Sequence, residues 1–282
     1  MDKIIEKTIQ LGISPCPNDT FTFHGLISGA VDLRGLRIET QYLDVEELNE
    51  RTARGEFDIA KVSFHAALSL GEEVVVLPTG SALGFGVGPV VLAHDTAAAK
   101  NPNPRVLTPG KWTTAHLLWR LFHPNQTDVH QVIFSEIVPA LERAEADLGV
   151  CIHEGRFTYA ERGLILVEDL GKTWEDEVRE ALPLGGIVGR RKLGLDTLRT
   201  FQAVLADSLS YGLAHREECL PTMQAHAQEL EADVLWKHVD LYVNEWTQDL
   251  GERGRTALEA LAWRARSAGV VSPVSKPLEI LS

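Results

Sequence analysis

The sequence predicts an α/β protein, because short apolar runs alternate with helical patterns through the first two thirds of the chain. Beyond Gly194 the pattern changes to helices alone. Two apolar segments rich in small residues, 88–94 and 183–189, are suited to act as hinges. We therefore expect a bilobal fold, in which two α/β domains are joined by two hinge strands and enclose a ligand-binding cleft.

The first predicted strand, 8–14, turns sharply into a helix. Pro15 and Pro17 fix φ in this turn and are expected to exclude helix, and Asn18 or Asp19 can cap the helix that follows. Unpaired N–H groups and the positive end of the helix dipole attract an anion or a polarised oxygen. The turn is thus a candidate binding segment, and the alternative is a stiff connection with no ligand.

Apolar runs bounded by turn residues predict the other strands, and helical periodicity predicts the helices. The further predicted strands are 36–43, 58–62, 74–77, 90–94, 105–108, 129–134, 148–153, 164–167 and 186–188. The C-terminal helices are predicted at 195–214, 216–228, 232–250 and 254–268, where they close one domain. We assign 1–93 and 188–282 to a large discontinuous domain and 94–187 to a small inserted domain.

Composition and charge exclude several classes of protein. The 282 residues are 44% hydrophobic and 24% charged, which are globular values, and 40 acidic against 27 basic residues give a net charge of -13. Such a charge repels a phosphate backbone or an anionic membrane, so we expect neither nucleic acid nor membrane as a partner. An anionic small molecule remains possible, because Lys61 or Arg156 can provide local positive charge.

The three cysteines, Cys16, Cys151 and Cys219, show no CxxC spacing, which argues against a disulfide framework and a zinc knuckle. The N-terminus lacks the continuous apolar core of a secretory signal, and no segment is apolar for long enough to span a bilayer. We therefore expect a cytoplasmic protein.

His153 is the strongest candidate for chemistry, because it closes an apolar run at the carboxyl end of a predicted strand, where open α/β sheets place their ligands. On a strand, Cys151 and His153 would point to the same face. Two ligands without a further Cys or His at a familiar spacing do not make a metal site, so we predict none. A general base is the better interpretation, with Glu154 or Arg156 as an orienting group; a capping or core histidine is the alternative.

Two other strand-to-helix junctions carry polar groups. In the first, Lys61-Val62-Ser63, the serine can cap a helix or bind a ligand oxygen, and the lysine can neutralise a carboxylate. The hydroxyls of Thr113 and Thr114 can act similarly before the next helix. The alternative for both junctions is ordinary capping. Asn49 follows an acidic helix start and is a further candidate.

Glycine-rich segments do not indicate a nucleotide site. Gly110-Lys111 lacks the upstream glycine of a phosphate loop, and the GxGxG spacing at 84–88 precedes a strand instead of opening a helix. We interpret the whole glycine-rich segment that contains this spacing, 80–89, as a tight pocket wall or hinge.

Seven blocks, taken in order, resemble the 1,4-dihydroxy-6-naphthoate synthase family of the futalosine route to menaquinone. They are Ser14-Pro15-Cys16-Pro17-Asn18-Asp19-Thr20-Phe21, Asp44-Val45-Glu46-Glu47-Leu48-Asn49, Lys61-Val62-Ser63, Gly84-Phe85-Gly86-Val87-Gly88-Pro89, Thr113-Thr114-Ala115, 152–159 and Leu182-Pro183-Leu184-Gly185. The resemblance implies a periplasmic-binding-protein-like fold of the second type. It also implies a lyase that converts cyclic dehypoxanthine futalosine to 1,4-dihydroxy-6-naphthoate and releases a three-carbon fragment.

The same resemblance implies roles for individual residues. The proton acceptor of the family falls on His153, and its substrate-contacting segments fall on Lys61-Val62-Ser63 and on Thr113-Thr114, with Asn18 and Asn49 as weaker candidates. We expect an anionic small-molecule substrate and no cofactor. Two alternatives stay open: a chorismate dehydratase-like sister enzyme of the same pathway, and a solute-binding protein without catalysis.

Overall fold

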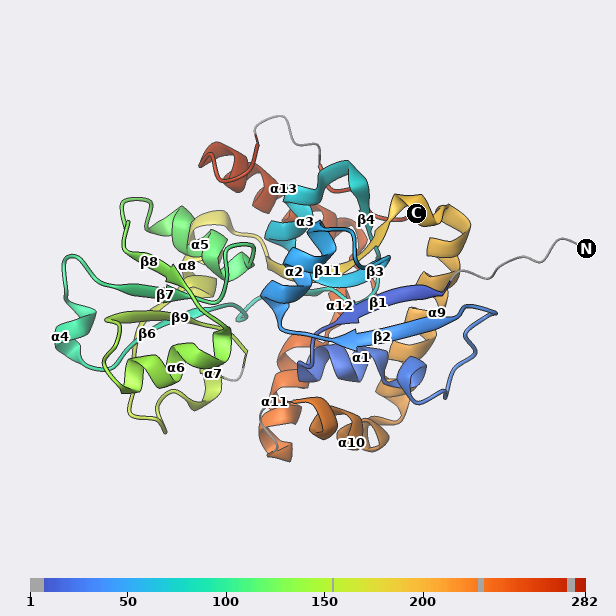
Figure 1. Ribbon diagram of the computed structural model, residues 1–282, viewed down its shortest axis with the longest axis horizontal. Helices are drawn as coiled ribbons and strands as arrows, with labels where there is room; N and C mark the ends of the chain where they lie inside the picture. Colours follow the sequence, from blue (N-terminus) through green and yellow to red (C-terminus); the bar gives the residue numbers. More distant parts are fainter. Residues whose placement is uncertain (1–7, 154, 228–230, 273–276) are drawn as a thin grey trace, which may run out of the picture.

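The computed structural model describes residues 8–153, 155–227, 231–272 and 277–282, and it shows two lobes side by side (Figure 1). In these residues the strands form two separate mixed sheets, one in each lobe. Helices pack on the faces of both sheets. The prediction of an α/β fold is confirmed. The exact limits of the two domains stay a prediction.

The sheet of the large lobe has the strand order β2-β1-β3-β11-β4, with β5 paired to β11. Its strands are β1 (Ile9–Ile13), β2 (Ile38–Tyr42), β3 (Ile59–Ser63), β4 (Val74–Val76), β5 (Ala82–Gly84) and β11 (Leu182–Arg190). Strands β1, β2 and β3 run parallel, whereas β11 is antiparallel to β3, β4 and β5. The carboxyl ends of β1 and β3 therefore lie at the same edge of this sheet.

The sheet of the small lobe has the order β10-β6-β9-β7-β8. Its strands are β6 (Val90–Ala93), β7 (Val106–Thr108), β8 (Val129–Gln131), β9 (Leu148–Cys151) and β10 (Ile165–Asp169). Strand β9 is parallel to β7 and antiparallel to β6, so the segment that follows β9 leaves at the same edge as the segment that follows β7.

The helices cover both sheets. In the large lobe, α1, α10 and α11 lie on one side of the sheet and α2, α3 and α13 on the other, while α4 to α8 surround the small sheet (Figure 1). Their bounds are α1 (Pro17–Ile27), α2 (Val45–Ala53), α3 (Phe64–Leu70), α4 (Thr96–Ala99), α5 (Thr114–Phe122), α6 (Phe134–Glu142), α7 (Gly155–Thr158), α8 (Leu170–Val178), α9 (Leu195–Ala214), α10 (Arg216–His226), α11 (Ala232–Tyr242), α12 (Glu245–Gln248) and α13 (Gly251–Ser267).

Fully buried apolar side chains hold α1 and α9 against the large sheet. Leu11 and Ile13 of β1 pack in one cluster with Phe23 of α1 and Phe201 of α9, and all four side chains are inaccessible to solvent. Burying one such side chain stabilises a fold by roughly 1.5–3 kcal/mol, so this cluster fixes the position where β1 passes into α1.

The turn after β1 differs from the prediction, because helix α1 begins at Pro17 itself. Proline is compatible with the first helical position, where the N–H that it lacks would have no partner inside the helix. Cys16 is consequently the N-cap residue, and Asn18 and Asp19 lie in the first turn of the helix rather than before it. This shift places both polar side chains at the helix end that faces the other lobe.

Other boundaries differ for local reasons. The predicted strand 129–134 ends at Gln131, and Phe134 begins α6. The predicted helix 232–250 is two helices, because Asn244 accepts the Trp246 N–H at 3.0 Å in a capping box that starts α12. Strand β5 was not predicted, because it lies within the glycine-rich segment 80–89 that we interpreted as a pocket wall or hinge.

The helix predicted over 216–228 ends at His226 in the structure, and Gln228 lies outside the described residues.

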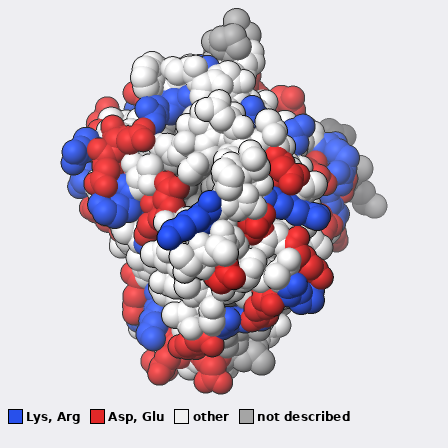
Figure 2. Space-filling view, turned by 90° about the vertical axis from the view of Figure 1, so that its left-hand side faces the viewer, with Lys and Arg blue, Asp and Glu red and all other residues white. Residues whose placement is uncertain are grey.

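Surface charge and helix length bear on the kinds of partner that the protein can bind. Figure 2 views the small-lobe side, where basic and acidic side chains are interspersed around a broad uncharged area. Binding to a phosphate backbone draws on a continuous basic patch, which this face lacks. No helix in the described part of the chain is long and apolar enough to cross a membrane.

Candidate active site

A pocket lies where the ends of strands from both lobes meet. The large lobe contributes the turn after β1, the end of β3, part of β11 and one face of α11. The small lobe contributes the start of α5 and the segment after β9. The lining residues are Ser14, Cys16, Asn18, Asp19, Val45, Lys61, Val62, Ser63, Ala82, Gly88, Pro89, Thr113, Thr114, Ala115, Ile152, His153, Leu184, Gly185, His238 and Tyr242.

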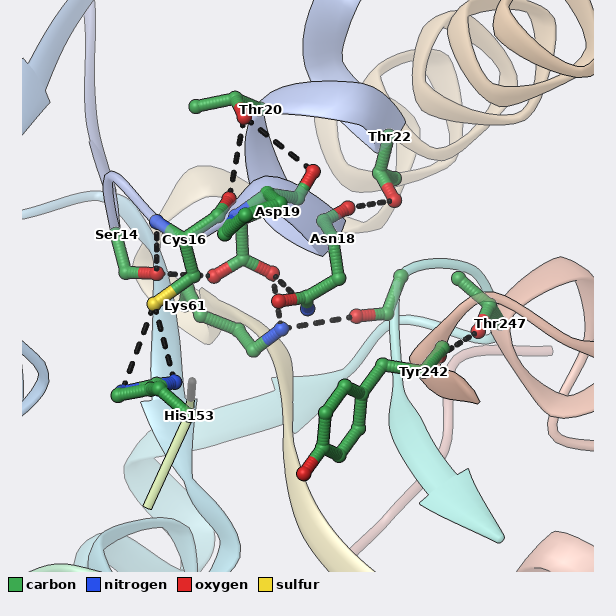
Figure 3. A network of polar contacts seen from close by, with 12 residues as sticks. Ser14, Cys16, Asn18, Asp19, Thr20, Thr22, Lys61, His153, Tyr242 and Thr247 are labelled. Carbon is green, nitrogen blue, oxygen red and sulfur yellow. Dashed lines mark hydrogen bonds and ion pairs between the residues drawn. The ribbon is translucent and has the colours of Figure 1, made fainter. Parts of the chain in front are cut away.

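A buried ion pair forms the floor of the large-lobe side. Lys61 Nζ donates to Asp19 Oδ1, and both side chains are less than one tenth exposed (Figure 3). Asp19 also accepts the Ser14 hydroxyl at 2.6 Å and the Asn18 amide at 2.9 Å. A carboxylate with this many donors is well satisfied, so the pair holds the β1–α1 turn against the end of β3.

Lys61 was expected to neutralise a ligand carboxylate, and its charge is instead balanced by Asp19. The ammonium group has three donors. One is used by Asp19 and a second by the Gly80 carbonyl oxygen at 3.4 Å. The third can still donate to a ligand, because Lys61 lines the pocket. The lysine therefore contributes a hydrogen bond rather than an uncompensated charge.

Ser63 is the N-cap residue of α3, as predicted, but its hydroxyl makes no capping hydrogen bond. Asn49 binds it instead: the Asn49 amide donates to Ser63 Oγ at 3.1 Å and accepts the Ser63 N–H at 2.8 Å. The Asn49 amide occupies one acceptor position of the Ser63 hydroxyl. The Ser63 O–H group therefore donates in a direction away from Asn49. Asn49 itself does not line the pocket, so it holds Ser63 from behind the wall.

The start of α5 supplies further donors. Thr113 caps the helix, since its Oγ1 accepts the His116 N–H at 3.1 Å, and the Thr114 hydroxyl donates to the Leu184 carbonyl at 2.6 Å. Both predicted hydroxyls are thus occupied by the protein. The N–H groups of Thr114 and Ala115 are in the first turn, where a helix provides no acceptor, and both residues line the pocket. Backbone N–H groups, rather than threonine hydroxyls, are therefore the donors that the start of α5 can offer to a ligand.

His153 lies just beyond the end of β9, in the left-handed region at φ 56°. Histidine enters this region at some cost, which is typical of residues at functional sites. The strand ends at Cys151, so the expected alternation was wrong: Cys151 packs in an apolar core, whereas the His153 imidazole contacts Cys16 of the other lobe. Phe134 of α6 meets the same ring edge to face, with centroids 4.7 Å apart. Glu154, predicted as an orienting group, lies outside the described residues.

Two lining residues on α11 were not predicted. His238 Nε2 contacts Asn18 Oδ1 at 3.0 Å, and because an amide oxygen only accepts, Nε2 carries the proton. Burial lowers the pKa of His238 well below its ordinary value, with His153 and Lys61 as further causes, so the ring is neutral. Burial also raises the pKa of Tyr242 to about 12 and keeps it a phenol. Both residues lie in a helical pattern that resembles core packing, and no local signal could have singled them out.

Asp44 is a further unpredicted acidic group near His153. Its Oδ1 caps α2 by accepting the Glu46 N–H at 2.8 Å, and its buried Oδ2 has no hydrogen-bond partner within the described residues. Burial raises the pKa of Asp44, and the charge of His153 acts in the opposite direction. Arg156, by contrast, is paired with Asp169 at 2.7 Å, so it offers no free charge to a ligand.

The structure thus brings seven of the eight predicted site residues to the pocket: Asn18, Lys61, Val62, Ser63, Thr113, Thr114 and His153. Asn49 alone lies behind the wall. Their roles in binding and catalysis stay a prediction. In the described ranges, no group of three or more His, Cys, Asp or Glu side chains could hold a metal ion. The arrangement offers two imidazoles, of which His238 donates to Asn18, together with several hydrogen-bond donors inside a largely apolar pocket.

This fold and site define a bilobal protein of the periplasmic-binding-protein-like class. The aliphatic sulphonate-binding protein SsuA from Escherichia coli aligns with a TM-score of 0.62 at 12% identity, covering 98% of this chain and 94% of that chain. A ligand-binding component of an ABC-type import system from Staphylococcus aureus aligns with a TM-score of 0.71, again at 12% identity, over 97% and 96% of the chains. At this identity the likeness shows the fold alone, and it confirms the predicted fold class.

The chain belongs to the menaquinone biosynthesis family, whose model matches residues 9–267. A 1,4-dihydroxy-6-naphthoate synthase from Thermus thermophilus is 40% identical over 96% of this chain and 99% of its own length. A synthase of the same name from Streptomyces coelicolor is 37% identical over 94% and 95%. A crystal structure from Archaeoglobus fulgidus aligns with a TM-score of 0.88 at 30% identity, covering 94% of this chain and 98% of that one. The family predicted from the sequence is confirmed.

Proposed function

We propose that this protein is a carbon–carbon lyase that converts cyclic dehypoxanthine futalosine to 1,4-dihydroxy-6-naphthoate and releases dihydroxyacetone. Two relatives that cover nearly the whole chain carry the name of this synthase, which supports the overall activity. The observation that carries the mechanism is the position of His153, an imidazole in a pocket that also holds the donors of Lys61 and Ser63.

In this proposal His153 accepts a proton from a substrate hydroxyl or carbon, which starts ring opening and cleavage of the carbon–carbon bond. The electrons of the broken bond enter the developing bicyclic ring, and its aromatisation drives the release of the three-carbon fragment. Ser63, the third donor of Lys61 and the N–H groups that open α5 hold the substrate carboxylate and stabilise negative charge as it develops.

The apolar part of the pocket suits the ring system of the product. Val62 and Leu184 approach from the large lobe and Ile152 from the small lobe, so a planar ring can be enclosed between them. Closing the lobes removes water from the ring and strengthens every hydrogen bond to the charged groups. The reaction as proposed needs neither metal nor organic cofactor, and the substrate is an anionic small molecule. The protein acts in the cytoplasm in this proposal.

The test is to incubate purified protein with cyclic dehypoxanthine futalosine and to follow 1,4-dihydroxy-6-naphthoate and dihydroxyacetone by mass. We expect turnover by the wild type and a loss of kcat of about 10²–10⁴-fold in His153→Ala, because this is the usual contribution of a general base to the rate. His130→Ala, at an exposed histidine of the same lobe, is the matched control and should retain kcat.

Each other outcome contradicts part of the proposal. Full turnover by His153→Ala would remove the base assignment. A wild type that is inactive here but dehydrates chorismate would assign the protein to the sister enzyme. Tight binding of either compound without any turnover would favour a solute-binding protein. Formation of 1,4-dihydroxy-6-naphthoate and dihydroxyacetone in equal amounts would support the carbon–carbon lyase class.

A further inference from the structure

The Cys16 thiol meets the imidazole of His153 from the opposite lobe. Its Sγ lies 3.3 Å from Nδ1 and 3.5 Å from Nε2 of the ring (Figure 3). A sulfur almost equidistant from both nitrogens cannot lie in the ring plane along the lone pair of either one. It lies over one face of the ring, where a polarisable sulfur packs well against a π-system. The contact therefore leaves the in-plane direction of each nitrogen to other partners.

The backbone of Cys16 is held rigidly on its own lobe. Its N–H donates to the Ser14 hydroxyl at 3.2 Å, and its carbonyl accepts the N–H groups of Asp19 and Thr20, both at 3.0 Å. As the N-cap residue of α1 it makes no side-chain capping bond, so the sulfur is available to the imidazole. The side chain is 7% exposed and lines the pocket.

His153, in contrast, sits on a short segment after β9 and in a left-handed backbone conformation. On its own lobe the ring has the edge-to-face contact with Phe134. From the large lobe the ring has the Cys16 contact and a stacked contact with His238, with centroids 6.1 Å apart, and both exist only when the two lobes approach each other. A ring packed from both lobes has few rotamers left, and a base must be held within a fraction of an ångström to be efficient.

We propose that Cys16 is a positioning residue for His153: its sulfur seats the imidazole when the cleft closes and fixes the nitrogen edge towards the substrate. This role rests on the proposed function of His153 as the base. It differs from nucleophilic catalysis, because no covalent bond to Cys16 forms. The other two thiols, Cys151 and Cys219, lie in apolar cores and are not among the residues that line the pocket. Burial raises the pKa of Cys151 to about 12 and that of Cys219 to about 11.

The first test is independent of turnover. With [13C-ε1]-labelled histidine the ten imidazoles give separate NMR signals, and His153→Ala identifies the signal of His153. In Cys16→Ala we expect that signal and its titration midpoint to move, whereas Cys219→Ala should leave both unchanged. Alanine keeps the backbone hydrogen bonds of residue 16, so the fold is retained. Among the described residues, Asp44 and His238 also act on His153 and are the same in both variants.

The second test measures turnover of cyclic dehypoxanthine futalosine. Cys16→Ala should lower kcat about tenfold with KM changed less than about twofold, and Cys16→Ser should recover part of kcat. A His153 signal that does not move in Cys16→Ala, or a kcat that does not fall, overturns the proposal. A wild type without turnover but with the expected NMR shift would refute the lyase function and leave the contact intact, so the two failures are distinguishable.

Discussion

The pair of Asp19 and Lys61 shows how single residues shape this pocket. Two opposite charges are removed from water together, at side-chain exposures of 4% and 8%. The desolvation cost is offset only while both partners and the extra donors to Asp19 are present. The pair thus positions a lysine donor at the pocket without leaving a net charge there.

We expect Asp19→Asn to lower the free energy of unfolding by about 3–5 kcal/mol, because it leaves the Lys61 ammonium buried without a counter-charge. The double variant Asp19→Asn with Lys61→Met should recover most of that loss, since no uncompensated charge remains. Urea denaturation at pH 7 measures both. A double variant as unstable as Asp19→Asn would show that the cost comes from lost hydrogen bonds rather than from the buried charge.

At this scale the sequence predicted the residues that follow strand ends and missed those on helices. Lys61 and Ser63 at the end of β3 and His153 after β9 were predicted because polar groups at the carboxyl ends of apolar strands gather at the edge of their sheet, and residues from both sheet edges line the pocket. His238 and Tyr242 approach from α11, more than eighty residues later in the chain, and their helical pattern is that of any buried face. Tertiary packing brings the His238 imidazole to the Asn18 amide, and the local spacing of residues does not predict this contact.

At the scale of elements, the contact of α3 with α5 buries two imidazoles. His65 Nδ1 donates to the Thr113 carbonyl at 3.2 Å, and His116 Nδ1 lies 3.1 Å from the Thr108 hydroxyl. Burial lowers the pKa of both to about 4, and the charges of Arg120 and Lys111 act in the same direction. Both rings are therefore neutral where α5 presents its first turn to the pocket.

This burial makes stability depend on pH. The unfolded imidazole keeps a pKa of about 6.5, so below that pH the unfolded state binds more protons and stability falls until about pH 4. Between pH 7 and pH 5, His65 should account for a loss of about 2 kcal/mol in the free energy of unfolding. His65→Asn, which keeps a donor for the Thr113 carbonyl but does not titrate, should lose about 2 kcal/mol less over this interval.

Urea denaturation at pH 7 and pH 5 gives the comparison, with His130→Asn as the control. His130 is an exposed histidine, 47% accessible, on β8. Its replacement should leave the loss close to that of the wild type. If His65→Asn loses as much stability as the wild type between the two pH values, burial of this imidazole is not the cause.

Helices with strong periodicity were predicted well, whereas helix boundaries that depend on a capping residue were predicted poorly. The long helix α9 matches its predicted range of 195–214, since a continuous apolar stripe leaves little choice. The break between α11 and α12 depends on the side chain of Asn244, which binds the backbone more strongly than the local pattern favours helix. Proline at the start of α1 was misjudged because its first-turn role depends on the position of the cap.

At the scale of the whole molecule, the lobes are joined by contacts away from the hinge strands. The Glu46 carboxylate, at the start of α2 in the large lobe, accepts the Trp112 N–H of the small lobe at 2.9 and 3.1 Å from its two oxygens. Gly110 lies against the same side chain, and a Cβ there would be 2.4 Å from the Glu46 carboxyl carbon. The close approach at φ 130° requires glycine, so Gly110 allows the two lobes to meet at this contact.

We expect Glu46→Ala to weaken this closed arrangement. A hydrogen bond to a charged group contributes about 1.5–3 kcal/mol, and a smaller closed population reduces the apparent affinity by the same fraction. KM for cyclic dehypoxanthine futalosine should therefore rise about tenfold, while kcat at saturation changes little, because bound substrate closes the lobes again. Small-angle X-ray scattering of the unliganded variant should give a larger radius of gyration than the wild type.

Glu47→Ala is the matched control, since Glu47 is the exposed neighbour on the same helix and pairs with Arg51 of that helix at 3.4 Å. It should change neither KM nor the radius of gyration. A Glu46→Ala variant whose KM and scattering equal those of the wild type would show that hinge geometry alone sets closure. A fall in kcat with an unchanged KM would place the effect on His153 instead, because both the Cys16 contact and the Glu46 contact form as the same two lobes meet.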